Sequence, residues 1–141
     1  MASEGPNDPS ASGTPSGWST NIFRASWDTL ANTYASDDAY SEANAPASGT
    51  SSEVAYVAGF GFAIPTEATI TGVLVKFEAY RDIAFATTIA AKIYTSTAYK
   101  SFGSKRSFVP PGDAEVGYQE LGGTNDLWGV SLTPALVNDA G

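Results

Sequence analysis

Residues 54–64, Val-Ala-Tyr-Val-Ala-Gly-Phe-Gly-Phe-Ala-Ile, carry an apolar side chain at every second position from Val54 onward. Successive side chains of a β-strand point to opposite faces, so this spacing predicts a strand with one apolar face. Gly59 and Gly61 lie on the opposite face and indicate that a backbone or an aromatic ring approaches closely there. Pro65 has no backbone N–H to donate, and we expect it to end the strand.

The same alternation continues toward the C-terminus. Residues 69–81 place Val75 and Phe77 on one face and Lys76 on the other, and a Pro-Thr-Glu-Ala turn joins this stretch to the preceding strand. Residues 87–99 alternate in the same way and are rich in Thr, Ile and Tyr, which favour strands. Shorter apolar pieces predict further strands at residues 108–109, 115–121 and 127–132.

Little helix is expected. Residues 22–44 mix aromatic side chains with Asn, Thr, Ser and Asp, which are poor helix formers, so we expect loop and a short strand there. One helical turn is predicted at residues 133–138, with Thr133 as the cap and Pro134 at the first helical position. Trp128, followed by a glycine, is suited to closing one end of a core.

These strands, separated by turn signals and long loops, predict an all-β fold with an antiparallel, jelly-roll-like β-sandwich over residues 22–141. Residues 1–21 are rich in Pro, Ser and Gly, and they predict an extended N-terminal arm without regular structure, or one that a partner subunit orders. Trp18 is the large apolar side chain of this arm. It either folds back onto its own domain or anchors the arm on a partner.

The amino-acid composition narrows the classes of function that we expect for this chain. The chain has 141 residues and 43% hydrophobic residues, enough for one domain. The 15 acidic and 7 basic residues give a net charge of -8, which argues against nucleic-acid binding. Lys105 and Arg106 are the adjacent basic pair, and we expect them in a solvated loop. With no Cys and no His, the common groups of neutral-pH catalysis are missing, so we expect no enzyme.

The lengths of the apolar runs also bear on whether the protein is expected in a membrane. None approaches the roughly 20 residues that span a bilayer, and the first residues do not resemble a signal segment. We therefore expect a soluble protein, made in a cytoplasm and without a membrane partner.

The acidic residues suggest two kinds of site, a calcium site and the carboxylate pair of a glycoside hydrolase. Asp37, Asp38 and Glu42 are candidate calcium ligands, because calcium takes hard oxygen ligands from carboxylates and loop carbonyls. Solvated or turn-capping carboxylates are the favoured alternative, since no repeated Asp-x-Asp spacing occurs. A glycoside hydrolase with paired carboxylates is less favoured still, because no motif selects a pair. Further calcium ligands from other loops would be Asp113, Glu115 or Asp126.

The seven tyrosines raise the question of a stacking surface for sugars or partners. Tyr80 and Tyr94 fall on the strand faces assigned to solvent, which makes them the leading candidates for contact with a partner or a host glycan. A half-buried tyrosine between strands is the ordinary alternative.

Five short motifs lie along the chain. They are Trp27-x4-Asn32-x4-Asp37-Asp38-Ala39-Tyr40, then 59–65 (GFGFAIP), 68–73 (ATITGV), 126–129 (DLWG) and 132–139 (LTPALVND). Together they resemble a domain found in bacteriophage virion proteins. The resemblance spans roughly residues 27–139 and implies a β-sandwich in capsid-associated, tail or appendage proteins, with no catalytic residues to carry over.

Together these observations lead us to expect a non-enzymatic bacteriophage virion structural protein. It would be made in the host cytoplasm and assembled into the virion as a homo-oligomeric decoration or minor capsid protein, or as a tail or fibre subunit. A carbohydrate-binding module is the alternative. In the family pattern a further strand follows residues 137–139, whereas the sequence ends at Gly141. Either the polypeptide continues, or a neighbour's arm completes the sheet.

Overall fold

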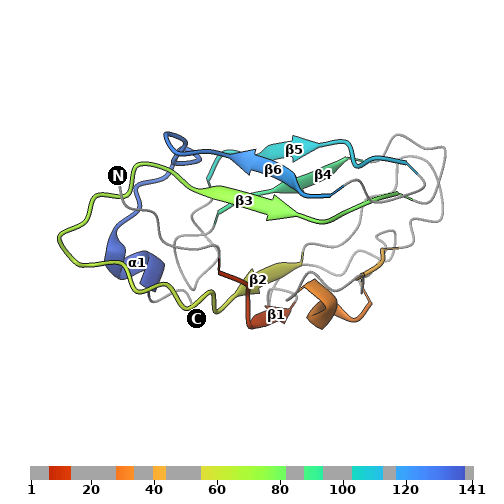
Figure 1. The fold of residues 1–141 in the computed structure, drawn as a ribbon, viewed down its shortest axis with the longest axis horizontal. Helices are drawn as coiled ribbons and strands as arrows, with labels where there is room; N and C mark the ends of the chain where they lie inside the picture. The colour runs from red at the N-terminus through yellow and green to blue at the C-terminus, as the bar shows by residue number, and fades with distance from the viewer. Residues whose placement is uncertain are drawn as a thin grey trace. The chain divides into compact units, whose positions relative to one another are not determined.

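The computed structural model of the chain describes residues 7–13, 28–33, 40–43, 55–81, 88–93, 103–112 and 117–138. This part consists of short strands with almost no helix (Figure 1), as the all-β prediction requires. In chain order the elements are β1 (Ala11–Gly13), the 3-10 helix η1 (Leu30–Thr33), β2 (Tyr56–Ala58), β3 (Leu74–Phe77), β4 (Ile89–Ala91), β5 (Arg106–Phe108), β6 (Gln119–Gly122) and α1 (Pro134–Asn138).

The strands form three small antiparallel sheets of two strands each. β1 pairs with β2, with Ser12 opposite Val57. β3 pairs with β6, and β4 pairs with β5. The chain divides into two compact units, of which residues 1–63 with 138–141 make the first and residues 64–137 make the second.

In the first unit, β1 corrects one expectation. We predicted no regular structure in the N-terminal arm, and this is wrong for Ala11–Gly13, which pair with β2 of the same chain. The Ser10 N–H and hydroxyl extend the pairing by donating to the carbonyls of Ala58 (3.0 Å) and Gly59 (2.7 Å). A strand edge needs only backbone groups from its partner, so a segment of small polar residues can pair although it has little apolar surface to bury.

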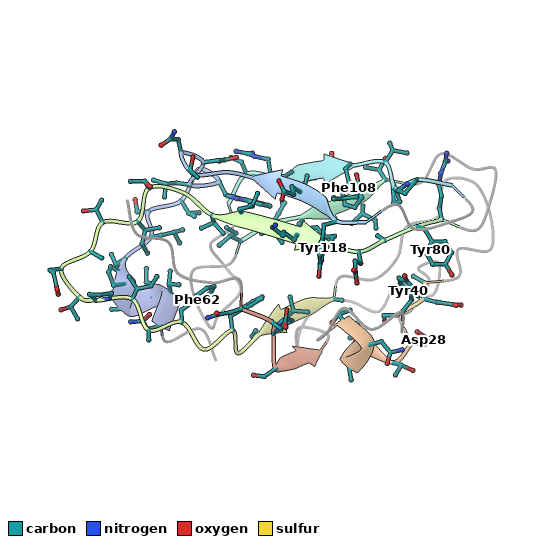
Figure 2. All side chains as sticks on the ribbon, viewed as in Figure 1. Asp28, Tyr40, Phe62, Tyr80, Phe108 and Tyr118 are labelled. Atoms are coloured by element: carbon teal, nitrogen blue, oxygen red, sulfur yellow. The ribbon has the colours of Figure 1, made fainter. Side chains whose placement is uncertain are left out.

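The strand predicted over residues 54–64 is much shorter than its alternation indicates. Only Tyr56–Ala58 are a strand. Gly59 and Gly61 have φ angles of 71° and 64°, in the left-handed region that interrupts a pleated strand. The alternation still brings two rings together, because the Phe60 and Phe62 rings stack with their centroids 5.8 Å apart. Figure 2 labels Phe62.

Residues 28–33 also differ from the loop and short strand expected there. Leu30–Thr33 form η1, and the Thr33 hydroxyl donates to the Leu30 carbonyl at 2.7 Å. The Asn32 amide nitrogen donates to the carbonyl of Tyr40 at 2.8 Å. Polar side chains that are unfavourable inside a long helix therefore satisfy backbone groups around a single short turn.

In the second unit, β3 follows its sequence pattern over a shorter range than predicted. Val75 and Phe77 are half-buried and Lys76 is exposed, which confirms the assignment of faces. The predicted strand over residues 69–81 is reduced to Leu74–Phe77. Val73 donates its N–H to the Asp126 carbonyl at 2.9 Å, in a loop contact that precedes the ladder.

Among the described residues of the second unit, the most buried side chains are Pro110 after β5, Leu121 within β6 and Trp128 in the turn after β6. Leu121 is 8% exposed and Trp128 is fully buried. β5 lies next to β6, and the Phe77 and Phe108 ring centroids are 5.8 Å apart, which links the β3–β6 ladder to the β4–β5 ladder. β4 keeps the predicted alternation, because Ile89 and Ala91 are half-buried while Ala90 is exposed.

In the C-terminal segment one prediction is wrong and another is confirmed. The strand expected at residues 127–132 is a turn, in which Trp128 has a φ of 58° and Gly129 a φ of 73°. The helical turn is confirmed as α1, and the Thr133 hydroxyl accepts the Leu136 N–H at 3.2 Å, as a cap does. Within the described ranges, no helix is long and apolar enough to cross a membrane.

Candidate functional site

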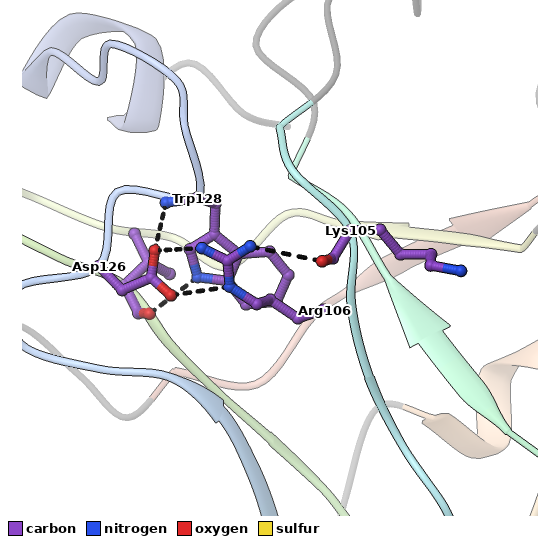
Figure 3. Close-up of polar contacts among 5 residues, drawn as sticks. Lys105, Arg106, Asp126 and Trp128 are labelled. Carbon is purple, nitrogen blue, oxygen red and sulfur yellow. Dashed lines mark hydrogen bonds and ion pairs between the residues drawn. The ribbon is translucent and has the colours of Figure 1, made fainter.

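The densest polar cluster among the described residues joins β5 to the turn after β6. Arg106 begins β5, and its Nε and Nη2 donate to the two carboxylate oxygens of Asp126 at 2.9 and 2.7 Å (Figure 3). The two parallel hydrogen bonds fix the guanidinium and carboxylate planes relative to one another. The side chains are 32% and 29% exposed, so this ion pair is at the margin of the core and not at the open surface.

Trp128 sits against this ion pair. Its backbone N–H donates to Asp126 Oδ1 at 2.8 Å, and its indole Nε1 donates to the Val73 carbonyl at 3.0 Å (Figure 3). The Arg106 guanidinium carbon lies 5.6 Å from the indole centroid, a cation–π distance. We call Arg106, Asp126 and Trp128 the Trp128 clamp, because the three side chains tie β5, the turn after β6 and the entry to β3 together.

Glycines make room for the clamp. Gly122 has a φ of 87°, and a Cβ there would lie 2.5 Å from the indole Nε1 and overlap with the Val73 carbonyl oxygen. A Cβ at Gly103 would lie 2.8 Å from the Trp128 carbonyl oxygen. That oxygen also accepts the Ser104 N–H. Any other residue at these two glycines would push a strand or the indole away.

The electrostatics of the clamp fit a structural role. The hydrogen bonds from Arg106, then the one from the Trp128 backbone, lower the pKa of Asp126 from its ordinary value of 3.8. The hydrogen bond to Asp126 raises the pKa of Arg106 above its ordinary value. A carboxylate with a lowered pKa and both oxygens engaged is a poor proton acceptor at neutral pH, so the clamp stabilises the fold and is not suited to acid–base chemistry.

Arg106 is the residue that the sequence reasoning placed wrongly. We expected Lys105 and Arg106 in a solvated loop, whereas Arg106 is the first residue of β5 and holds Asp126. Lys105 is exposed, and its carbonyl accepts Arg106 Nη1 at 3.3 Å. An arginine can bond a carboxylate through two guanidinium nitrogens and lie on an indole face, whereas a lysine cannot. This difference could have distinguished Arg106 from Lys105 in the sequence.

The candidate calcium ligands are not brought together in the described residues. Asp37, Asp38, Asp113 and Glu115 lie outside those residues. Glu42 is exposed, and its backbone N–H donates to Asp28 Oδ1 at 2.7 Å. Asp126 is the partner of Arg106. No group of three or more His, Cys, Asp or Glu side chains that could hold a metal ion occurs within the described ranges.

Asp28 joins two segments of the chain through its carboxylate and its backbone. Besides its carboxylate contact to Glu42, its backbone N–H donates to the Glu42 carbonyl at 3.0 Å. The Ser41 hydroxyl donates to the Asp28 carbonyl at 2.6 Å. Figure 2 marks Asp28 and Tyr40, which lie on the two sides of this contact. The acidic residue therefore closes a loop through its own backbone and side chain.

The candidate partner-contact residues are only partly described. Trp18 and Tyr94 lie outside the described residues. Tyr80 was assigned to a solvent-facing strand position; it lies beyond the end of β3 and is 38% exposed (Figure 2).

Tyr118 is one of the seven tyrosines considered for a stacking surface, but it was not among the leading candidates. This tyrosine precedes β6 and is 52% exposed. Lys76 Nζ lies 5.7 Å from the Tyr118 ring centroid and 3.1 Å from Glu120 Oε1. The sequence signal for Tyr118 is its spacing of two residues from Glu120, because two strand residues at this spacing point to the same face, and both side chains are exposed.

No known protein family, no curated protein and no solved structure matches the chain. The function is therefore argued from the contacts and exposure of the described residues, together with the motif resemblance.

Proposed function

We propose that this chain is a non-enzymatic structural subunit of a bacteriophage virion. In this proposal the strands belong to a jelly-roll-like β-sandwich. The protein acts through contacts between subunits, as a decoration or minor capsid protein or as a subunit of a tail or fibre.

The observation that carries the proposal is the amount of apolar surface left accessible. Among the described residues, the buried hydrophobic side chains are Leu121 and Trp128. Apolar side chains of the paired strands, such as Phe77 and Phe108, are only half-buried. Burial of such surface contributes about 25 cal/mol per Å², so a contact between subunits that covers these side chains would be stabilised by it. The large hydrophobic side chains exposed by 38–55% are Val57, Leu74, Tyr80, Val109, Tyr118 and Leu136.

The Trp128 clamp supports the non-enzymatic part of the proposal. Its charged groups contact one another and the backbone, so they are used to hold strands in place. Strand pairs of three or four residues have few ladder hydrogen bonds, so the clamp adds contacts that hold the strands of a structural subunit together.

The sandwich and the virion assignment have separate support. Alternating exposure along β3, β4 and β5 is what a sheet with one covered face produces. The location in a virion rests on the resemblance of the motifs quoted above. In the DLWG motif the structure shows a role for two members, since Asp126 and Trp128 belong to the clamp.

A carbohydrate-binding module is the second candidate, favoured by the tyrosines. Tyr118 and Tyr80 are exposed, and Lys76 and Glu120 beside Tyr118 offer a donor and an acceptor. An aromatic face flanked by polar groups suits a sugar ring. A glycan binder of this kind would act as a monomer, whereas a structural subunit would not.

The test is the presence of the chain in particles. Particles of the virus whose genome encodes the chain are purified on a density gradient, and their proteins are identified by mass spectrometry. We expect the chain to co-purify with the particles in a fixed ratio to the major capsid or tail protein. Its absence from particles, together with saturable binding of a host glycan by the monomer, would replace this proposal with the second candidate.

A further inference from the structure

The β1–β2 ladder has the features of a contact that can form between two copies of the chain. Ala11, Ser12 and Gly13 lie opposite Ala58, Val57 and Tyr56. Ser10 adds a backbone and a side-chain hydrogen bond, both to carbonyl oxygens. The hydrogen bonds from Ser10 are therefore accepted by the main chain, and any copy of β2 offers the same acceptors.

β1 pairs with the backbone edge of β2, and the Val57 side chain directly opposite Ser12 is 41% exposed. No tight turn fixes the pairing within one chain, because residues 14–55 separate the two strands. The entropic cost of closing a connection rises only slowly with its length, so a connection of this length does not by itself tie β1 to the β2 of its own chain.

We propose that β1 exchanges between copies, so that residues 11–13 of one subunit pair with residues 56–58 of the next in the register of the β1–β2 ladder. This inference rests on the proposed structural function and names its partner, a second copy of this chain. Within an assembly the local concentration of neighbouring β2 strands is high, which favours the exchanged form over the closed one. The closed β1–β2 ladder is then the form of the isolated subunit.

Cysteine pairing tests the exchange, because the chain has no cysteine of its own. Ser12 and Val57 lie directly opposite each other in an antiparallel pair, a placement whose Cα separation suits a disulfide. Two full-length variants, Ser12→Cys and Val57→Cys with a mass tag on the latter, are mixed in equal amounts, unfolded, refolded together and oxidised. In this mixture a disulfide between the two variants can form only between chains.

The control mixture pairs Ser12→Cys with Ser107→Cys, an exposed position on β5 that reports random collision. We expect roughly tenfold more mixed disulfide from the Ser12→Cys and Val57→Cys mixture than from this control. A Ser12→Cys/Val57→Cys double variant should give disulfide-linked dimers and higher multimers on a non-reducing gel. Equal yields in the two mixtures, with only a linked monomer from the double variant, would overturn the exchange.

Light scattering on the unmodified chain separates this failure from failure of the proposed function. If the exchange fails and the chain still forms oligomers, only the strand exchange is wrong. If the chain is also a monomer throughout the micromolar range, both the exchange and the structural role are wrong.

Discussion

Residues 56–64 and residues 119–129 show opposite relations between sequence pattern and structure. The first stretch has the strongest apolar alternation in the chain, yet only Tyr56–Ala58 form a strand, and Phe60 and Phe62 stay half-buried. The second stretch has a weak pattern, yet it contains the buried Leu121 and the fully buried Trp128.

The difference lies in how each stretch uses its glycines. Gly61 has a positive φ and open space where a Cβ would be, so it serves only the path of the backbone. Gly122 has a positive φ and lies against the indole and the Val73 carbonyl, so it serves packing as well. Burial in this protein therefore follows specific contacts between distant residues more closely than it follows alternation along one strand.

The largest effect is expected from Trp128→Ala. Removing a fully buried indole, its hydrogen bond to Val73 and its contact with Arg106 should lower the free energy of unfolding by about 3–5 kcal/mol. The matched change in the other region, Phe62→Ala, removes a half-buried ring and should cost about 1–2 kcal/mol. Urea denaturation of both variants measures the difference, and equal losses would remove the distinction between the two regions.

The second comparison uses two glycines in the same backbone conformation. Gly122→Ala should cost about 2–4 kcal/mol, because it adds a collision with Trp128 and Val73 to the strain of a left-handed alanine. Gly61→Ala should cost about 1–2 kcal/mol from backbone strain alone, since its Cβ would meet nothing within 4 Å. Thermal unfolding of the two variants should rank them in this order, and the reverse order would contradict the packing role of Gly122.

A smaller, pH-dependent effect is expected from the clamp carboxylate. The pKa of Asp126 is lower in the folded protein than its ordinary value of 3.8, so folding favours the ionised form. Its contribution is present in full above that ordinary value and is lost as the pH falls through the lowered pKa of the folded state. Stability curves at pH 2 to 7 should therefore show an acid loss that Asp126→Asn reduces.

Arg106→Gln provides the matched test of that carboxylate, because it removes the partner that lowers the pKa. It should reduce the same acid loss, and the double variant should behave like either single variant. An acid loss that neither substitution changes would show that other carboxylates cause it.

The smallest effect is expected at the start of α1. Thr133→Ala removes the hydroxyl that accepts the Leu136 N–H, and it should cost about 0.5–1 kcal/mol. Thr133→Ser keeps the cap and should cost less. Amide hydrogen exchange at Leu136 should rise in the alanine variant, and an unchanged rate would show that the cap does not hold this turn.

Local rules predicted the features that depend on neighbours in sequence. The faces of β3 follow from Val75, Lys76 and Phe77, and the start of α1 follows from Thr133 and Pro134, as expected. The turn after Pro65 also forms, with the Ala68 N–H donating to the Pro65 carbonyl at 3.0 Å. Each of these depends on side-chain alternation or on a cap within a few residues.

The clamp could not be predicted in this way. Arg106 and Asp126 lie 20 residues apart, and Trp128 and Val73 lie 55 apart, so no local pattern links them. Arg106 was placed in solvent because it is one of an adjacent basic pair that was read as a loop, whereas in the structure it contacts an indole and a carboxylate. The length of β2 was overestimated because alternation does not report the φ angles of Gly59 and Gly61.

We propose that the chain functions through contacts between its own copies, and its mass in solution is the direct test of those contacts. Light scattering coupled to size exclusion, from one to several hundred micromolar, measures that mass. We expect species at multiples of 14.6 kDa whose share grows with concentration. A folded species that stays at 14.6 kDa across the whole range would contradict it.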